Sequence, residues 1–147
     1  MSTVAGCPLC AEDGGRLVVR RPELRVIRPD DAAFPATYRV VWNAHVAEWT
    51  DLPPAQRSSC MQAVATVETV LREALAPAKV NLASLGNFVP HLHWHVIARF
   101  EWDSHWPQPV WGPAQRTVQP RPAERLRASP EALDERVAAA FAPLDGY

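Results

Sequence analysis

The sequence lacks three features that would each point to a particular class of protein. It has no apolar run near the roughly 20 residues that a membrane helix needs, so we expect no membrane association. Its formal net charge is −1, with 15 basic and 16 acidic residues. Proteins that bind nucleic-acid polymers are usually strongly basic, so no polymeric partner is expected. A small nucleotide remains a suitable ligand, because it needs only a local site.

Cysteine is also scarce, since Cys7, Cys10 and Cys60 are the three present in 147 residues. An odd number of cysteines, with no basic stretch and apolar core near Met1, is typical of a reducing compartment. We therefore expect a cytoplasmic protein. A chain of this length suits one compact domain whose hydrophobic core needs no disulfide support.

Proline, in contrast, is abundant, with 15 residues, and seven of these lie from Pro107 to Pro143. This shift in composition predicts a folded core over residues 1–102. We expect residues 103–147 to form a proline-rich arm and a C-terminal helix that pack on the same domain.

Short β-prone runs separated by turn residues predict a sheet. Five strands are expected, at residues 17–19, 24–27, 38–42, 80–85 and 91–100. Most of them are joined by short turns, which favours antiparallel pairing. One longer connection, between the third and the fourth strand, has room for a helix. The order of elements therefore predicts an α+β fold with a mainly antiparallel sheet.

Two segments carry helix signals. Pro53 and Pro54 suit the start of a long central helix, and Pro77 suits its end. Between them, apolar residues recur at helical spacing, at Met61, Val64, Val67, Leu71 and Leu75. Ser129 as N-cap and Pro130 at the first helical position predict the C-terminal helix.

Three of the five histidines of the chain, His91, His93 and His95, alternate within five residues. Alternate side chains of a strand point to the same face, so we expect all three to share one face of the sheet. Imidazole titrates near neutrality, binds metals and can act as a nucleophile. The alternatives are therefore buried structural histidines, a zinc site with hydrolase chemistry and a nucleophilic site.

Residues 91–97, His-Leu-His-Trp-His-Val-Ile, resemble the signature of the histidine triad (HIT) family, in which histidines alternate with apolar residues. Further matching features lie upstream in the family's order: a Cys pair, a segment around His45, and the residues Asn81, Gly86 and Asn87. The resemblance covers roughly residues 7–100. It implies the HIT-like fold, with a five-stranded sheet, one long central helix and a C-terminal helix, and it implies a homodimer.

The resemblance also implies chemistry. Family members include hydrolases that cleave phosphoramidate or phosphoanhydride bonds at the α-phosphate of a nucleotide. By resemblance, His93 is the nucleophile that forms a nucleotidyl-histidine intermediate, and His95 assists at the phosphate or the leaving group. Candidate substrates are a purine nucleoside phosphoramidate, an acyl-adenylate and a dinucleoside polyphosphate. The alternatives are a nucleotidyl transferase such as a phosphorylase, and a nucleotide-binding sensor with little turnover.

The same resemblance implies a set of substrate-binding residues. The amides of Asn81 and Asn87 would donate to phosphate oxygens, and Gly86 would let the backbone approach the ligand. An ordinary turn explains Gly86 and Asn87 equally well. His91 is a candidate for the substrate site as well as for a metal site.

Residues outside these motifs bear on specificity. By resemblance, Asp30 or its neighbour Asp31 would hydrogen-bond a ribose hydroxyl. Phe88 stands where many members carry Ser or Thr, so a hydroxyl donor is missing there. Trp106 and Trp111, among the prolines of the arm, would border the nucleotide pocket or a partner subunit; packing on their own domain is the equal alternative.

Cys7 and Cys10 form a Cys-x-x-Cys motif, which supplies half of a tetrahedral zinc site. The resemblance implies that His45 and His91 supply the other half, as in zinc-containing members. Zinc would then be structural and would tie the start of the chain to the sheet. A free cysteine pair is the alternative. No organic cofactor is expected.

Overall fold

The fold is that of the predicted α+β class. The computed structural model describes residues 2–142, in which five strands form one antiparallel sheet of order β1-β2-β3-β5-β4. The strands are β1 (Arg16–Arg20), β2 (Leu24–Arg28), β3 (Thr37–Trp42), β4 (Lys79–Ala83) and β5 (His93–Arg99). The helices are α1 (Pro8–Ala11), a 3-10 turn (Trp49–Asp51), α2 (Pro54–Leu75), α3 (Pro122–Arg125) and α4 (Pro130–Phe141).

Helix α2 forms where the spacing of apolar residues predicts it. It begins at Pro54 and ends at Leu75. The next residue, Ala76, has a left-handed φ of 47°, and Pro77 follows it. Its buried residues include four of the predicted positions, Val64, Val67, Leu71 and Leu75. These side chains belong to the main hydrophobic core, so burial of this face holds the helix on the sheet.

Helix α4 is capped and anchored by polar groups. The Ser129 hydroxyl accepts a hydrogen bond from the Ala132 backbone N–H, as the sequence predicts for an N-cap. One turn further on, buried Asp134 accepts hydrogen bonds from the Tyr38 hydroxyl at 2.7 Å and from Arg28 Nε at 2.9 Å. Burial and the neighbouring carboxylate raise the pKa of Tyr38 above its ordinary value, so the hydroxyl stays a donor.

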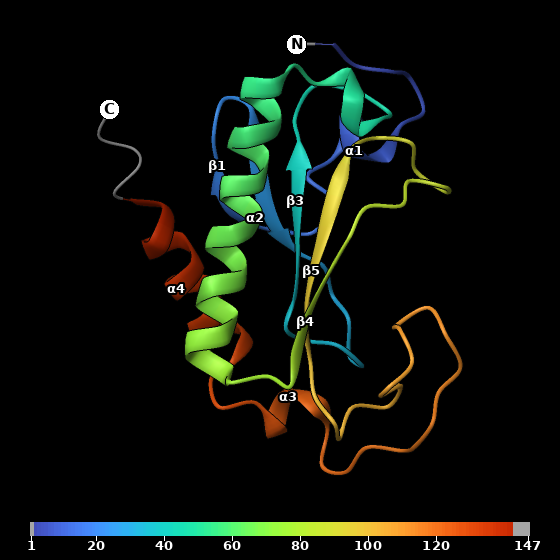
Figure 1. The fold of residues 1–147 in the computed structure, drawn as a ribbon, viewed down its shortest axis with the longest axis vertical. Coiled ribbons are helices and arrows are strands. Elements are labelled where there is room, and N and C mark those ends of the chain that lie inside the picture. The colour runs from blue at the N-terminus through green and yellow to red at the C-terminus, as the bar shows by residue number, and fades with distance from the viewer. Residues whose placement is uncertain (1, 143–147) are drawn as a thin grey trace.

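The two faces of the sheet are different. Val40 pairs with Trp94 across β3 and β5, and these residues face the core formed with α2. Because side chains alternate along a strand, His93 and His95 point to the opposite face. Figure 1 shows α2 and α4 together on one side of the sheet. The two histidines therefore lie away from the helical layer, where a ligand can reach the sheet.

The segment before β5 departs from the predicted strand. The predicted strand begins at His91, but the observed one begins at His93. His91 lies instead in a tight turn around Pro90, in which its backbone N–H donates to the Val89 carbonyl at 2.8 Å. Proline has no backbone N–H for a ladder, so the turn replaces strand pairing at this point. His91 therefore lies in the turn before the strand that carries His93 and His95, and not in the strand itself.

Two further differences concern local structure. Strand β4 ends at Ala83, two residues earlier than predicted, and the chain then turns at Gly86, whose φ is +78°. The short helix α1 is not among the predicted elements. Within residues 2–142, no helix combines the length and the apolarity that a membrane span requires.

Candidate active site and metal site

His93 is held in one defined tautomer. Its side chain is 8% exposed, and its Nδ1 lies 2.6 Å from the His91 carbonyl oxygen. A carbonyl oxygen only accepts hydrogen bonds, so Nδ1 carries the proton and donates it. In the neutral ring, Nε2 then holds a lone pair. This nitrogen is the atom of His93 that is able to attack an electrophile.

The protonation state of His93 suits that role. Burial lowers the pKa of His93 below its ordinary value of 6.5. The hydrogen bond to the His91 carbonyl acts in the opposite direction, and the positive charge of Arg39 lowers the pKa further. The ring is therefore neutral at pH 7 and needs no deprotonation before it attacks.

His95 lies beside His93 with its ring in an edge-on contact. The centroids of these two rings are 5.0 Å apart. The Trp111 ring makes a second edge-on contact with His95, with a centroid distance of 5.2 Å. Burial, followed by the electrostatic influence of His93 and of Arg39, lowers the pKa of His95 to about 4. A neutral imidazole still has one N–H, so His95 can donate a hydrogen bond to a ligand at neutral pH.

Four side chains converge beside the start of this strand, as the zinc hypothesis expects. The ligand atoms of Cys7, Cys10, His45 and His91 all lie within 4.8 Å of one another. The Cys7 Sγ to His91 Nδ1 distance is 3.4 Å, and the Cys10 Sγ lies 3.4 Å from His45 Nδ1 and 3.5 Å from His91 Nδ1. In a tetrahedral zinc site, bond lengths of about 2.3 Å to sulfur and about 2.0 Å to nitrogen separate the two atoms by about 3.5 Å.

The tautomer of His91 also fits a tetrahedral zinc site. Its Nε2 lies 2.6 Å from the Trp42 carbonyl oxygen, so Nε2 carries the proton and donates it. The lone pair of Nδ1 therefore faces the two cysteines, as a metal ligand requires. Since both ring nitrogens are engaged, this geometry favours the metal role of His91 over the substrate role.

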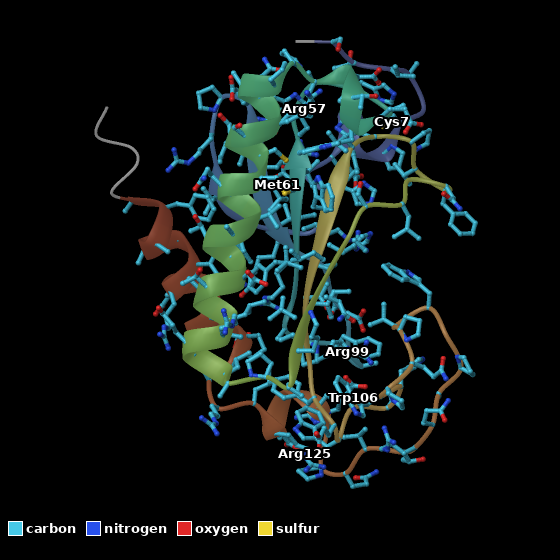
Figure 2. The ribbon with its side chains drawn as sticks, viewed as in Figure 1. Cys7, Arg57, Met61, Arg99, Trp106 and Arg125 are labelled. Atoms are coloured by element: carbon cyan, nitrogen blue, oxygen red, sulfur yellow. The ribbon has the colours of Figure 1, made fainter. Side chains whose placement is uncertain are left out.

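These four residues can bind a metal ion, and their number decides what it would do. Four protein ligands complete a tetrahedral zinc site and leave no position for water or substrate. Such a site stabilises structure, and this one would join α1, the segment after β3 and the turn before β5. In Figure 2, Cys7 lies near one end of β5 and Arg99 lies at the other end.

Arg25 supports the metal site and gives no signal in the sequence. This arginine is 4% exposed, and its guanidinium donates to the Leu9 carbonyl at 2.7 Å, the Glu12 carbonyl at 3.1 Å and the Asn43 Oδ1 at 3.0 Å. It therefore fixes the backbone of the Cys-x-x-Cys segment against β2. Its partners are mostly backbone carbonyls, which sequence patterns do not reveal.

The predicted substrate-binding residues lie in different surroundings. Asn81, on β4, accepts a hydrogen bond from Arg99 Nη1 through its Oδ1 at 2.9 Å, which leaves its amide nitrogen to donate elsewhere. Asn87 is exposed in the turn after Gly86. Asp30 is exposed as well, whereas the Asp31 carboxylate accepts the backbone N–H groups of Ala33 and Phe34.

The turn between β4 and β5 contains two more residues of interest, Ser84 and Phe88. The Ser84 hydroxyl donates to the His93 carbonyl at 3.0 Å and so holds the turn to β5. The Phe88 side chain is fully exposed to solvent.

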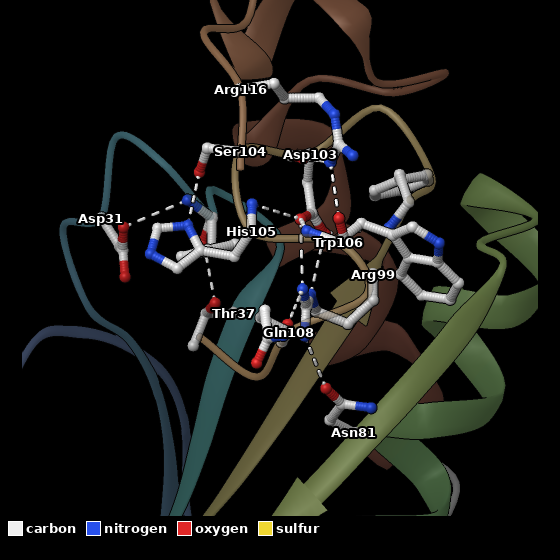
Figure 3. A network of polar contacts seen from close by, with 12 residues as sticks. Asp31, Thr37, Asn81, Arg99, Asp103, Ser104, His105, Trp106, Gln108 and Arg116 are labelled. Carbon is white, nitrogen blue, oxygen red and sulfur yellow. Dashed lines mark hydrogen bonds and ion pairs between the residues drawn. The ribbon is translucent and has the colours of Figure 1, made fainter. Parts of the chain in front are cut away.

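The arm after β5 is fixed by a buried ion pair. Arg99 and Asp103 are each 2% exposed, and Arg99 Nε lies 2.8 Å from Asp103 Oδ2 (Figure 3). Arg99 also donates to the Gln108 carbonyl at 2.7 Å, which folds the arm back over the sheet. A groove of about 640 Å³ lies between β4 and the arm, and Trp106 and Trp111 line it.

Comparison with known proteins gives the family. The family model described as the HIT domain matches residues 11–102, which is more than half of the chain. The protein belongs to the HIT family. The match covers β1 to β5 together with both triad histidines of the strand and the turn that carries His91. The HIT family includes nucleotide hydrolases and also binding proteins.

Solved structures of HIT proteins resemble this chain over most of its length. A histidine triad protein from Bradyrhizobium japonicum is 28% identical, with 88% of this chain and 90% of that chain covered and a TM-score of 0.67. A histidine triad protein from Marinobacter aquaeolei is 26% identical, with coverages of 92% and 91% and a TM-score of 0.66. No curated protein matches the sequence.

A third structure is more distant. A zinc-bound histidine triad family protein from Mycobacterium smegmatis is 18% identical, with 95% of this chain and 96% of that chain covered and a TM-score of 0.61. At this identity the likeness shows the fold alone.

The pKa of His95 makes a first prediction. The native pKa of about 4 lies below the ordinary value near 6.5, so the unfolded chain binds a proton at higher pH than the native protein does. His95 therefore costs stability as the pH falls from 6.5 towards 4. In an NMR titration of the histidine rings, His95 should have a midpoint near 4 in the native protein and near 6.5 in urea. A native midpoint of 6 or above would contradict the buried, neutral ring.

The metal site makes a second prediction. Protein purified without added metal should contain close to one zinc per chain, measured by elemental analysis. Cys10→Ser removes a ligand atom that lies near both histidines, so it should lose most of the metal and lower the melting temperature.

Cys60→Ser is the matched control. Cys60 lies on α2, is 1% exposed and packs in the main hydrophobic core, away from the four candidate ligands. It should keep the metal. Wild-type protein without zinc, or equal zinc contents in the two variants, would refute the site.

Proposed function

We propose that this HIT protein is a hydrolase that cleaves a nucleotide at its α-phosphate through a covalent intermediate on His93. The observation that carries the proposal is the hydrogen bond from His93 Nδ1 to the His91 carbonyl at 2.6 Å. Because Nδ1 is bound to the backbone, Nε2 of the neutral ring holds the free lone pair. The ring lies on the face of the sheet that the helices leave open.

The proposed reaction has two displacements. In the first, the Nε2 lone pair of His93 forms a bond to the α-phosphorus, and the bond from phosphorus to the leaving group breaks with its electron pair. The leaving group accepts a hydrogen bond or a proton from the N–H of His95 or from water. In the second displacement, water attacks phosphorus and loses a proton to solvent, and the bond from phosphorus to Nε2 breaks with its electron pair returning to Nε2. This step releases the nucleoside monophosphate. His93 returns to its neutral form with Nδ1 still protonated.

The remaining residues are proposed to hold the nucleotide. The amide nitrogen of Asn81 and that of Asn87 would donate to phosphate oxygens, and the left-handed turn at Gly86 would let backbone N–H groups approach them. The Asp30 carboxylate would accept a hydrogen bond from a ribose hydroxyl. We expect the base near Trp111, whose ring contacts His95 and lines the groove beside the arm.

Zinc is the metal proposed for the cluster of two cysteines and two histidines. The donor set of Cys7, Cys10, His45 and His91 is a common zinc environment, and the Mycobacterium smegmatis protein is described as zinc-bound. Cysteines that are free of disulfides are typical of a reducing compartment, which agrees with the proposed cytoplasmic location.

The proposed substrates are a purine nucleoside phosphoramidate, an acyl-adenylate and a dinucleoside polyphosphate. They share the bond at the α-phosphate and differ in the leaving group. Turnover that requires inorganic phosphate as acceptor would instead indicate a phosphorylase, and tight nucleotide binding without turnover would indicate a sensor.

A labelling experiment tests the mechanism. Incubation with adenosine phosphoramidate that carries a radioactive α-phosphorus should give the wild-type protein an acid-labile label, because a phosphorus–nitrogen bond to histidine is hydrolysed in acid. His93→Ala lacks the nucleophile, so it should give no label and lose at least about 1000-fold in kcat.

His105→Ala is the matched histidine variant, because His105 lies in the arm with its ring against Phe34. It should still be labelled. Equal turnover by wild type and His93→Ala would reject the covalent mechanism.

A homodimer is proposed from the edge of the sheet. Strand β4 has no neighbour on its outer side among the described residues, and apolar side chains are exposed on it and in the turn that follows. They are Leu82 at 43%, Leu85 at 50% and Phe88 at 101%. Exposed apolar groups next to an open strand edge favour pairing with another chain.

Light scattering after gel filtration tests this proposal. The wild-type protein should have twice the mass of one chain, and Leu82→Lys should shift it towards the monomer, because a charge would be buried in the interface. Leu17→Lys, on β1 at the opposite edge, is 40% exposed in the wild type and should stay dimeric. A wild-type monomer at micromolar concentration would exclude the homodimer.

A further inference from the structure

Arg39 occupies a position beside the two histidines of the strand. It lies on β3, where it pairs with His95 across the ladder to β5, while Val41 pairs with His93. Directly paired residues of an antiparallel ladder project to the same face. Arg39 therefore projects to the face of the sheet that carries His93 and His95, and not towards α2.

The guanidinium of Arg39, a half-buried residue, differs from those of Arg25, Arg28 and Arg99. Its Nε is buried and has no hydrogen-bond partner, and no ion pair joins Arg39 to an acidic residue within residues 2–142. In contrast, Arg25 donates to backbone carbonyls, Arg28 pairs with Asp134, and Arg99 pairs with Asp103. Each of those three groups has a partner that explains its position.

The nearby acidic side chain does not fill that role. Asp31 interacts with Arg39 electrostatically, but one of its carboxylate oxygens accepts two backbone N–H groups of its own loop, and it forms no ion pair with Arg39. Burial lowers the pKa of Arg39, which reflects the loss of water around a charged group. Enclosing a donor without an acceptor costs free energy, which an anionic ligand would recover.

We propose that Arg39 binds a nonbridging oxygen of the substrate phosphate that lies against His93. This inference rests on the proposed function, because it uses the same nucleotide and the same nucleophile. The guanidinium is a planar donor that suits phosphate oxygens, and it adds a positive charge beside two neutral histidines. Arg39 thereby selects nucleotides over nucleosides, and it stabilises the negative charge that builds on the oxygens during attack.

Binding of the product and of its uncharged analogue isolates this interaction from turnover. Calorimetry should show that the full-length protein, with its metal content measured, binds AMP or GMP more tightly than the matching nucleoside. Arg39→Gln should weaken binding of the monophosphate by about 10- to 100-fold, as expected for loss of a charge-assisted hydrogen bond. Binding of the nucleoside should stay unchanged, and Arg39→Lys should recover part of the loss.

Arg136→Gln is the matched control, because Arg136 is exposed on α4 in the helical layer, and it should bind like the wild type. Unchanged nucleoside affinity of Arg39→Gln also shows that the site is folded, and Arg39→Lys offers a second variant should the first fail to fold. Wild-type protein that does not prefer the monophosphate, or an Arg39→Gln variant that keeps the full preference, overturns the proposal.

The kinetic readout separates the two proposals. With adenosine phosphoramidate as substrate, Arg39→Gln should lower kcat/KM by at least the factor seen in binding, while the His93 label still forms slowly. If Arg39 governs monophosphate binding but wild type gives neither label nor turnover, the hydrolase fails and the phosphate site stands. If His93 is labelled and Arg39→Gln binds and reacts like wild type, the hydrolase stands and the role of Arg39 fails.

Discussion

The geometry of the site depends on the hydrogen bonds of one residue, His91. Its Nε2 donates to the Trp42 carbonyl, which directs Nδ1 towards Cys7 and Cys10, and its own carbonyl accepts from His93 Nδ1. The same residue therefore sets the ligand geometry of the metal cluster and the tautomer of the proposed nucleophile. A shift of this backbone would disturb both, because the two hydrogen bonds of 2.6 Å leave little freedom in the ring or the carbonyl.

Strand β5 is fixed at both of its ends, and it carries His93 and His95, the residues proposed to react with the substrate. At one end, the four candidate metal ligands surround the turn before the strand, and Arg25 holds the backbone of the Cys-x-x-Cys segment. At the other end, Arg99 is the last residue of the strand, and its buried ion pair with Asp103 anchors the arm. A site on a regular element with fixed ends keeps its side chains in place without reorganisation, which is a condition that the proposed attack on phosphorus requires.

Sequence patterns predict most of this fold, because the relevant signals are local. Short β-prone runs between turn residues locate the five strands, and helical spacing of apolar residues locates α2. Ser129 and Pro130 mark the start of α4, and the structure contains the Ser129 N-cap. What the patterns miss depends on contacts between distant segments. Arg25 acts on backbone carbonyls, and His91 leaves the strand because Pro90 forces a turn. A lone arginine on a strand gives no signal until the register places Arg39 opposite His95.

Burial determines the charge of the histidines on the face of the sheet that carries His93 and His95. Water is largely excluded from His93 and His95, so both rings are neutral at pH 7 and add no positive charge to attract a phosphate. Arginine is the side chain that keeps its charge under the same exclusion, since its ordinary pKa lies far above neutrality. A site that needs an uncharged nucleophile and an anionic substrate therefore has to divide these tasks between residue types. The structure contains this division, with neutral imidazoles on β5 and a guanidinium opposite them on β3.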